Sequence, residues 1–313
     1  MPRWLRIILT VAAALIVAVL GGWYYAWGRE AVPETTTYAL DIAELRRLAG
    51  SLPGERPLRI NHEQVTEMSL PLGAVFAWKS ISTPLSFTHG AYQVVYPDGF
   101  GMIDSGFDEA SWKVMSRGQP STFSKDGYAA IQRGLAAAKW IVITHEHKDH
   151  VGGIVAFETP SDLVGRLQLT PEQLGNSSAN SGIPEIAPAL REALQPLAYD
   201  HYHALAPGVV LIKAPGHTPG SQMVFVQLAD GREVLFLGDV AWHLDQIRQL
   251  WYRPRVITNF LVHENREEVM GEFRALYNLM KAEPSLTLLV SHDVAERAAL
   301  IESGLLGEHF ERP

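Results

Sequence analysis

The sequence has 313 residues, of which 47% are hydrophobic and 9% aromatic, and its formal net charge is −8 at pH 7. This length allows one large domain or two small ones, and the hydrophobic content is sufficient for a buried core. An acidic chain without a basic block is not expected to bind nucleic acid. Because there is no cysteine, disulfides, thiolate metal ligands and a cysteine nucleophile are excluded.

The first segment is an uncharged apolar run from Ile7 to Trp27. About 20 such residues cross a bilayer as a helix. Arg3 and Arg6 precede the run and aromatic residues close it, as is typical of a membrane span whose N-terminus is cytoplasmic. We therefore expect residues 1–28 to be a single-pass membrane anchor with the rest of the chain on the extracytoplasmic side, which is the periplasm in a diderm bacterium. A cleaved signal peptide is the alternative.

Two further regions follow the apolar run. Residues 29–70 read as a connector with one short amphipathic helix at 41–49, capped by Asp41. Residues 71–313 show the regular pattern of one α/β domain, with GNSSANSG (175–182) as an exposed loop. Within this domain, apolar or alternating runs predict strands at 73–82, 91–97, 99–104, 139–144, 209–214, 221–228, 233–239 and 286–291, and helical periodicity predicts helices at 126–138, 264–283 and 294–302.

Three histidines and an aspartate crowd into the seven residues THEHKDH at 144–150. His145 and His147 directly follow a predicted buried strand, and Asp149 and His150 come next, where a helix is expected to begin. Metal ligation needs several lone-pair donors that converge on one point, and imidazole and carboxylate groups supply them. The motif therefore predicts a metal site, with solvated loop histidines as the alternative.

Four more polar residues stand at the ends of predicted strands. They are Asp104 in IDSG, His217 in GHTPGS, Asp239 in LGD and His292 in SHD. Any one of them alone is more typical of a helix cap or a surface side chain. Their shared position at strand ends, around the histidine-rich motif, indicates that they belong to the same site.

These five motifs, spread over about residues 70–300, resemble those of the metallo-β-lactamase-fold superfamily of metallohydrolases, in its binuclear lactonase and glyoxalase II-like branch. The resemblance implies an αββα sandwich preceded here by the N-terminal transmembrane helix, with the site at one edge between the two sheets. It also implies two divalent metal ions, with zinc favoured by the all-nitrogen-and-oxygen ligands and iron or manganese as alternatives. The implied ligands are His145, His147 and His217 for the first metal, Asp149, His150 and His292 for the second, and Asp239 for both.

The resemblance also implies roles in a reaction. Asp104 would orient a ligand histidine and fix its tautomer. A hydroxide that bridges the two metals would attack a carbonyl or phosphoryl centre, and Asp149 would pass a proton to the leaving group. His243 is a candidate substrate contact, because it follows Asp239 by only four residues.

A few positions bear on the branch of the superfamily. Asp239 argues against true β-lactamases of this fold, which usually carry Cys or Ser there. The acidic balance argues against nucleases, and the scarcity of basic residues after His292 argues against glyoxalase II-type thioesterases. We therefore expect a metal-dependent hydrolase of a small carbonyl substrate, either a lactone or an ester. A thioesterase or phosphodiesterase of the superfamily, and an iron-dependent redox or sensing protein on the same fold, are the alternatives.

Residues 154–207 and 240–263 lie between the motifs and are expected to supply the walls of the substrate site, although core packing is the alternative for each side chain. Other histidines are expected to be outside the site: His201 and His203 lack a following Asp-His pair, and no role is predicted for His62, His89, His263 or His309. The candidate wall residues are Phe157, Leu174, Tyr199, Tyr202, Trp242, His243, Trp251 and Tyr252.

Overall fold

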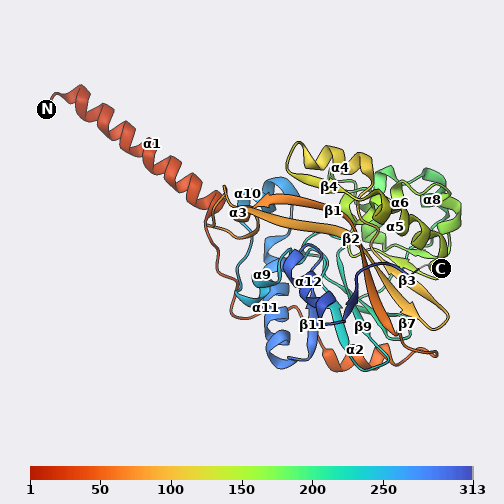
Figure 1. Cartoon of the computed structure of the whole chain (residues 1–313). Coiled ribbons are helices and arrows are strands. Elements are labelled where there is room, and N and C mark those ends of the chain that lie inside the picture. The colour runs from red at the N-terminus through yellow and green to blue at the C-terminus, as the bar shows by residue number, and fades with distance from the viewer. Residues whose placement is uncertain (312–313) are drawn as a thin grey trace.

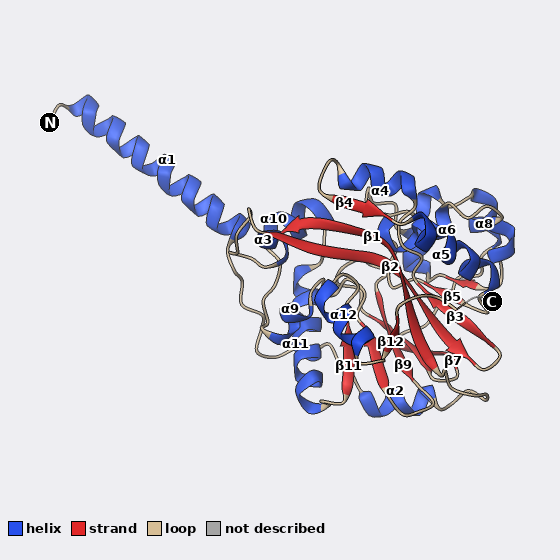
Figure 2. Ribbon diagram, in the orientation of Figure 1, coloured by secondary structure: helices blue, strands red, loops and turns tan. Residues whose placement is uncertain are grey.

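Two β-sheets packed face to face form the body of the protein, and a long helix, α1 (Arg3–Trp27), projects from it (Figures 1 and 2). The computed structural model describes residues 1–311, so the last two residues of the predicted catalytic domain, 312–313, lie outside the described residues. The two sheets with their covering helices form an αββα sandwich, which confirms the predicted fold class.

The first sheet has seven strands. Its longest pair is antiparallel β1 (Arg59–Pro71) and β2 (Pro84–Tyr96), with a register that runs from Arg59 opposite Val95 to Pro71 opposite Pro84. The strand order is β12-β1-β2-β3-β5-β6, with β4 also paired to β1. The remaining strands are β3 (Gly99–Ile103), β4 (Ser121–Phe123), β5 (Ile141–Val142), β6 (Leu167–Gln168) and β12 (Leu306–Gly307).

The second sheet has five strands in the order β11-β10-β9-β8-β7. Side chains alternate between its faces, as the pleat requires: on β8, Val209 and Leu211 face the first sheet, whereas Val210 and Ile212 face the outer helices. The strands are β7 (Tyr202–Ala206), β8 (Val209–Lys213), β9 (Gln222–Gln227), β10 (Glu233–Phe236) and β11 (Leu286–Leu289).

Helices cover both outer faces of the sandwich. Against the second sheet pack α2 (Ile42–Ala49), α9 (Leu244–Arg248) and α11 (Arg266–Ala282). Against the first sheet pack α5 (Lys125–Ala137), α6 (Lys148–Val155) and α8 (Pro188–Ala193). The other helical segments are α3 (Leu72–Val75), α4 (Glu109–Ser116), η1 (Pro160–Leu163), α7 (Pro171–Gly175), η2 (Ile183–Glu185), α10 (Arg255–Ile257), η3 (Thr258–Val262) and α12 (Val294–Glu302).

Two sequence predictions differ from the structure. The strand expected at 73–82 is wrong: this segment is the single turn α3 followed by a loop in which Trp78 has a positive φ of 67°. Gly73 donates its amide to Ser80 O at 2.8 Å, so the chain doubles back too tightly for a strand. The region 29–70, expected to be a connector, includes β1, which pairs with β2 along its length.

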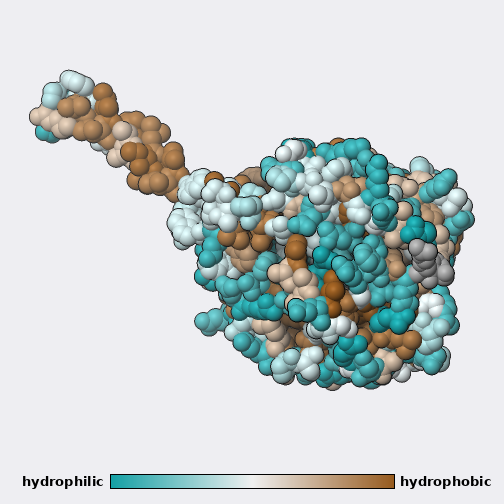
Figure 3. Space-filling model, viewed as in Figure 1, coloured by the Kyte–Doolittle hydropathy of each residue, from teal (hydrophilic) through white to brown (hydrophobic). Residues whose placement is uncertain are grey.

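The helix α1 has no buried residue, and it is the one helix in the described part of the chain that is long and apolar enough to cross a membrane. Figure 3 shows its hydrophobic surface along most of its length outside the body. Its last turn contacts the body, because the amide of Trp78 donates to Trp27 O at 2.9 Å. The apolar run therefore forms a helix that could be an anchor or a signal sequence.

Candidate metal centre

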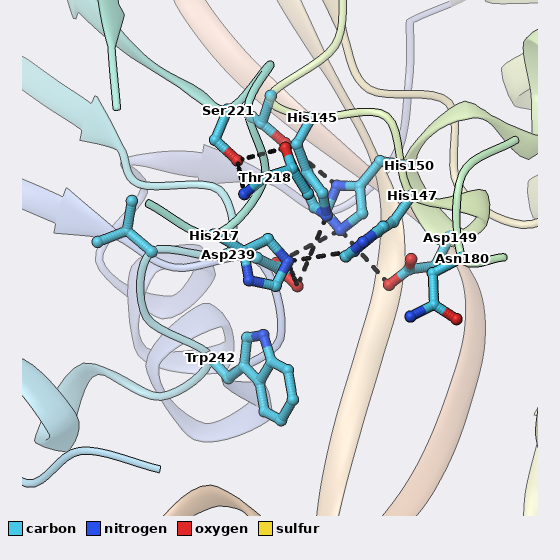
Figure 4. A network of polar contacts seen from close by, with 12 residues as sticks. His145, His147, Asp149, His150, Asn180, His217, Thr218, Ser221, Asp239 and Trp242 are labelled. Carbon is cyan, nitrogen blue, oxygen red and sulfur yellow. Dashed lines mark hydrogen bonds and ion pairs between the residues drawn. The ribbon is translucent and has the colours of Figure 1, made fainter. Parts of the chain in front are cut away.

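The histidine-rich motif lies where a strand of the first sheet gives way to a helix. His145 and His147 follow β5, and His147 is the residue before the first turn of α6, which carries Asp149 and His150. The strand ends bring the remaining predicted ligands to the same place, because His217 follows β8, Asp239 follows β10 and His292 follows β11. Figure 4 shows several of these side chains pointing toward one another.

The seven predicted ligands form two groups, each able to hold a metal ion. Cluster one consists of His145, His147 and His217, and cluster two of Asp149, His150, Asp239 and His292. Within each group the ligand atoms lie within 4.8 Å of one another. All of these residues are buried except Asp149, whose side chain is 18% exposed. Asp149 is therefore the member that solvent reaches most easily.

Asp239 belongs to cluster two, and its second carboxylate oxygen faces cluster one. Its Oδ2 is 3.9 Å from His145 Nε2 and 3.6 Å from His217 Nε2. Its Oδ1 is 2.9 Å from His292 Nε2 and 3.4 Å from His150 Nε2. The carboxylate of Asp239 is thus within 3.9 Å of histidines from both clusters.

The chemistry of the donors fits metal ions. The Nε2 atoms of His145 and His150 are buried and have no hydrogen-bond partner within residues 1–311, although buried polar atoms are normally paired. Burial lowers the pKa of His147 to about 3 and that of His145 well below its ordinary value. Both rings are therefore neutral at pH 7, which is the form in which imidazole donates a lone pair to a metal.

Asp104 lies behind cluster two and fixes one of its histidines. The Nδ1 of His150 donates to Asp104 Oδ2 at 2.9 Å, and this leaves Nε2 facing the cluster. The amide of Thr144 donates to the other oxygen, Oδ1, at 2.6 Å. Asp104 adopts a positive φ of 63°, a conformation that non-glycine residues rarely adopt.

Glu264 plays the corresponding part behind cluster one, and the sequence analysis missed it. His217 Nδ1 donates to Glu264 Oε1 at 2.7 Å, and the buried guanidinium of Arg253 lies 2.6 Å from the same oxygen. Burial would raise the pKa of Glu264, but Arg253 and His217 outweigh burial and hold it below its ordinary value. Glu264 is therefore a charged acceptor. It stands in a loop before α11 without a neighbouring motif, so no sequence signal marked it.

Glu146, inside the motif itself, was also missed. It is fully buried and accepts a hydrogen bond from Thr218 Oγ1 at 2.9 Å and another from Asn176 Nδ2 at 2.5 Å. Thr218 follows the ligand His217, so Glu146 ties the loop after β5 to the loop after β8. Its place between His145 and His147 was the signal that could have revealed it.

His89, for which no role was predicted, lies against cluster two. Its Nε2 is 3.8 Å from Asp149 Oδ2, and its ring centroid is 4.6 Å from that of His292. It comes from β2, which borders the site, and its Nδ1 lies 2.9 Å from Thr66 Oγ1 on β1. His62, His201, His203, His263 and His309 belong to neither cluster.

The candidate wall residues divide into two groups. Trp242 lies near the clusters, with its ring centroid 6.4 Å from that of His217 (Figure 4). His243 caps α9, and its Nδ1 lies 3.2 Å from Asp293 Oδ2. The others pack into the hydrophobic interior or beside it, which is the alternative that the sequence left open: Phe157, Leu174, Tyr199, Tyr202, Trp251 and Tyr252.

Comparisons with known proteins agree with this geometry. N-acyl homoserine lactonases AttM from Rhizobium radiobacter and from Agrobacterium fabrum are 26% and 28% identical to the chain over 176 residues, which are 49% of this chain. The matched region spans 65% of the length of these relatives, just under two thirds.

Solved structures share the fold at lower identity. A quorum-quenching N-acyl homoserine lactone lactonase is 15% identical with a TM-score of 0.62, covering 79% of this chain and 97% of its own. A Bacillus thuringiensis AiiA mutant with bound N-decanoyl-L-homoserine is 16% identical with a TM-score of 0.62, covering 78% and 96%. The family model "Metallo-beta-lactamase superfamily" matches residues 91–279. With its αββα sandwich and its two clusters of potential metal ligands, the chain belongs to the metallo-β-lactamase superfamily.

Proposed function

We propose that the protein is a membrane-anchored, binuclear metal-dependent hydrolase that acts on a small carbonyl substrate, a lactone or an ester. The observation that carries this proposal is the pair of ligand clusters with Asp239 between them. Nothing in a structural protein requires seven converging ligand side chains in a buried pocket. Hydrolysis, by contrast, uses two adjacent cations to activate water and to polarise the substrate.

In this proposal cluster one holds one divalent ion and cluster two the other, with Asp239 as the shared ligand. The ions are most simply zinc, because every donor is nitrogen or oxygen and histidine predominates, with iron or manganese as alternatives. When bound, they would supply a water of lowered pKa and a Lewis acid for the carbonyl oxygen. Asp104 and Glu264 would hold His150 and His217 in the tautomers that aim Nε2 at the ions.

Asp149 is the proposed proton carrier. It is the most exposed of the seven ligands, so its carboxylate can exchange protons with solvent and leaving group. His89 stands beside it at 3.8 Å and limits the positions that its side chain can take. His243 is proposed as a substrate contact at the edge of the site, where it packs against Phe76 with ring centroids 5.3 Å apart.

The substrate class is supported by the walls of the site as well as by the relatives. Phe87 stacks on His292 with ring centroids 5.5 Å apart, and Trp242 lies beside His217. These rings place apolar groups next to the ligands, and the guanidinium of Arg253, which lies 4.5 Å from the ring of Trp242, is paired with Glu264. The related lactonases named above act on N-acyl homoserine lactones, which combine a lactone ring with an apolar acyl chain.

The anchor is proposed from α1 and its contacts. A signal peptide is removed from the mature protein, but the last turn of α1 is built into the body: Tyr24 packs on Trp78 with ring centroids 5.7 Å apart, and Arg255 lies 4.8 Å from the ring of Tyr25. These contacts favour retention. The basic residues Arg3 and Arg6 precede the helix, so the body would lie on the extracytoplasmic, periplasmic side.

Elemental analysis of the purified full chain, together with a panel of lactones, aryl esters, thioesters and phosphodiesters, tests the proposal. We expect two zinc ions per chain and turnover of lactones or esters. A His145→Ala variant should be folded and inactive, and hydrolysis retained in that variant would refute the assignment. One iron per chain with no hydrolysis of any substrate would instead support the redox or sensing alternative.

A further inference from the structure

Large apolar side chains are exposed on two segments beside the base of α1. Trp78 and Ile81, in the loop after α3, are 58% and 53% exposed, and Phe260 and Leu261, in η3, are 70% and 58% exposed. We call these four residues the anchor-side face. Single exposed apolar residues are ordinary, but a group of four on neighbouring segments marks a surface that contacts something.

Both segments are tied to the last turn of α1. Trp78 contacts Tyr24 and donates its amide to Trp27 O at 2.9 Å. Arg255, which stacks on Tyr25, begins the helical stretch α10 that continues directly into η3. Phe260 is thus five residues from a contact with α1, a rise of about 8 Å along a helix. Figure 1 shows α3 and α10 next to the base of α1.

The C-terminal end of α1 indicates how deep this face would lie in the membrane. Trp23, Tyr24, Tyr25 and Trp27 form the kind of aromatic belt that lies at the level of the lipid headgroups. Residues that touch these side chains lie at nearly the same depth. Arg29 and Lys79 lie beside them, each 4.2 Å from the ring of Trp251.

We propose that the anchor-side face lies in the membrane interface and presents the metal centre to amphiphilic substrates held in the bilayer. This inference rests on the proposed function, because it takes α1 as the anchor and a carbonyl compound as the substrate. It adds two points to that function. The partner of the anchor-side face is a lipid surface, and the substrate is an ester or lactone with a long apolar chain.

A continuous apolar cluster links the face to the metal centre. Val75, Phe76, Phe87 and Trp242 are buried together, with partly buried side chains packed around them. One end of this cluster reaches the ligands through Phe87, which stacks on His292. The other end reaches the anchor side through its partly buried members, which include Leu72, Ile257 and Val262.

A polar contact makes the same connection on the other side of the site. Asn180 Nδ2 donates to Leu261 O at 2.7 Å, and Asn180 O accepts the amide of Lys148 at 3.1 Å. Figure 4 shows Asn180 beside Asp149. Through these two contacts, which do not involve the side chain of Leu261, η3 is joined to the turn that precedes Asp149. The apolar side chains packed between this face and the ligands would suit the acyl chain of a substrate that is held in the bilayer.

The absence of cysteine allows a direct test on the full chain, since a single introduced cysteine is the only thiol. Three variants, Phe260→Cys, Val114→Cys and Leu15→Cys, would carry an environment-sensitive fluorophore in phosphatidylcholine–phosphatidylglycerol nanodiscs. Val114 is 59% exposed on α4, which Figure 1 shows away from the base of α1, and Leu15 is 61% exposed within α1. Brominated lipids then report contact of each probe with the bilayer.

We expect a blue-shifted and strongly quenched probe at 260 and at 15, and an unquenched probe at 114. Quenching at 15 but not at 260 would overturn the inference while leaving the anchor intact. No quenching at 15 would overturn the anchor, and the inference with it. Quenching at 114 as strongly as at 260 would also overturn it, because the body would then contact lipid without using this face.

A second experiment tests the delivery of substrate. The double variant Phe260→Ser and Leu261→Ser should hydrolyse a short, water-soluble ester at the unchanged rate but a long-chain ester embedded in vesicles about tenfold more slowly. Equal rates on the embedded ester would overturn delivery through this face. If the unmodified chain hydrolyses neither ester, the proposed hydrolytic function fails, whereas the probe at 260 still decides whether the face contacts lipid.

Discussion

In each cluster a buried carboxylate accepts a hydrogen bond from one histidine, but the two clusters differ in charge. Cluster one contains three imidazoles and no carboxylate of its own, whereas cluster two contains Asp149 and Asp239 beside two imidazoles. Burial lowers the pKa values of His145 and His147, and it acts in the same direction on His150 and His292. In cluster two, however, the nearby carboxylates outweigh burial and raise the pKa values of both histidines.

Cluster one therefore offers nitrogen donors alone, whereas cluster two adds two carboxylates. Each cluster relies on a carboxylate behind one histidine: Glu264 behind His217, and Asp104 behind His150. The carboxylate behind cluster one needs a buried partner of its own, Arg253, whereas Asp104 receives neutral donors from Thr144. Cluster one therefore depends on a longer chain of buried charges, and the following predictions test that asymmetry.

Removal of Asp239, the proposed shared ligand, should abolish the distinction between the clusters. In Asp239→Ala, both sites lose a carboxylate, so we expect loss of both metals and a fall in kcat/KM of about 1,000-fold or more, equivalent to several kcal/mol of transition-state stabilisation. Metal content and hydrolysis measure this. Asp245→Asn, which alters a partly exposed aspartate on α9, is the control. Full activity of Asp239→Ala would contradict a shared role for this carboxylate.

Removal of Arg253 should damage cluster one through folding stability. Arg253 is fully buried, with its guanidinium 2.6 Å from Glu264 and 4.5 Å from the ring of Trp242. Arg253→Met removes the buried cation that neutralises Glu264 and leaves it only the hydrogen bonds from His217 and Tyr252, so the free energy of unfolding should fall by about 3–5 kcal/mol. Chemical denaturation in detergent measures the change. The additional variant Glu264→Gln should recover part of the stability, and no recovery would argue against the ion pair as the cause.

The two supporting carboxylates should affect different metals. We expect Glu264→Gln to weaken the metal at cluster one and Asp104→Asn to weaken the metal at cluster two, each by about 10- to 100-fold, because the ligand histidine loses its orienting acceptor. Competition with a chromophoric chelator measures both affinities. Glu267→Gln, at an exposed acid of α11, is the matched control. If either variant lowered the affinity for both metals equally, the two carboxylates would not act on separate clusters.

The smallest expected effect concerns Glu272, which supports the loop of cluster one. Its Oε1 accepts the amide of Gly216, and burial raises the pKa of Glu272 to about 8 from an ordinary value of 4.5. Below pH 4.5 both folded and unfolded chains hold this proton. Between pH 4.5 and 8 only the folded chain keeps it, so this group makes the protein less stable as pH rises, by an amount on the order of a few kcal/mol.

Glu272→Gln removes this titration while keeping an oxygen for the amide of Gly216. Between pH 5 and pH 8, the free energy of unfolding should therefore decline less in the variant than in the unmodified chain. Urea denaturation of both proteins across this range provides the comparison. Parallel curves would mean that Glu272 is already ionised in the folded chain.

Much of the fold could be predicted because its signals are local. The helix α12 occupies residues 294–302 as expected, and Asp41 caps α2 by accepting the amide of Glu44 at 3.1 Å. The strand expected at 73–82 was wrong because its apolar residues serve a tight turn and the surface beside α1. Strand β1 was missed because its alternation is weak, and its identity depends on pairing with β2.

The sequence by itself determined the residue types of the metal centre and their order, since histidines and aspartates at strand ends are visible in the chain. It also determined the apolar helix, because a run of about 20 uncharged apolar residues is typical of a helix long enough to cross a bilayer. Only the tertiary structure decided which side chains stand behind the ligands. Glu264, Arg253 and His89 come from segments without a motif, and they reach the centre because the two sheets pack face to face. The position of the anchor-side face was decided in the same way, because it is formed by segments about 180 residues apart in the sequence.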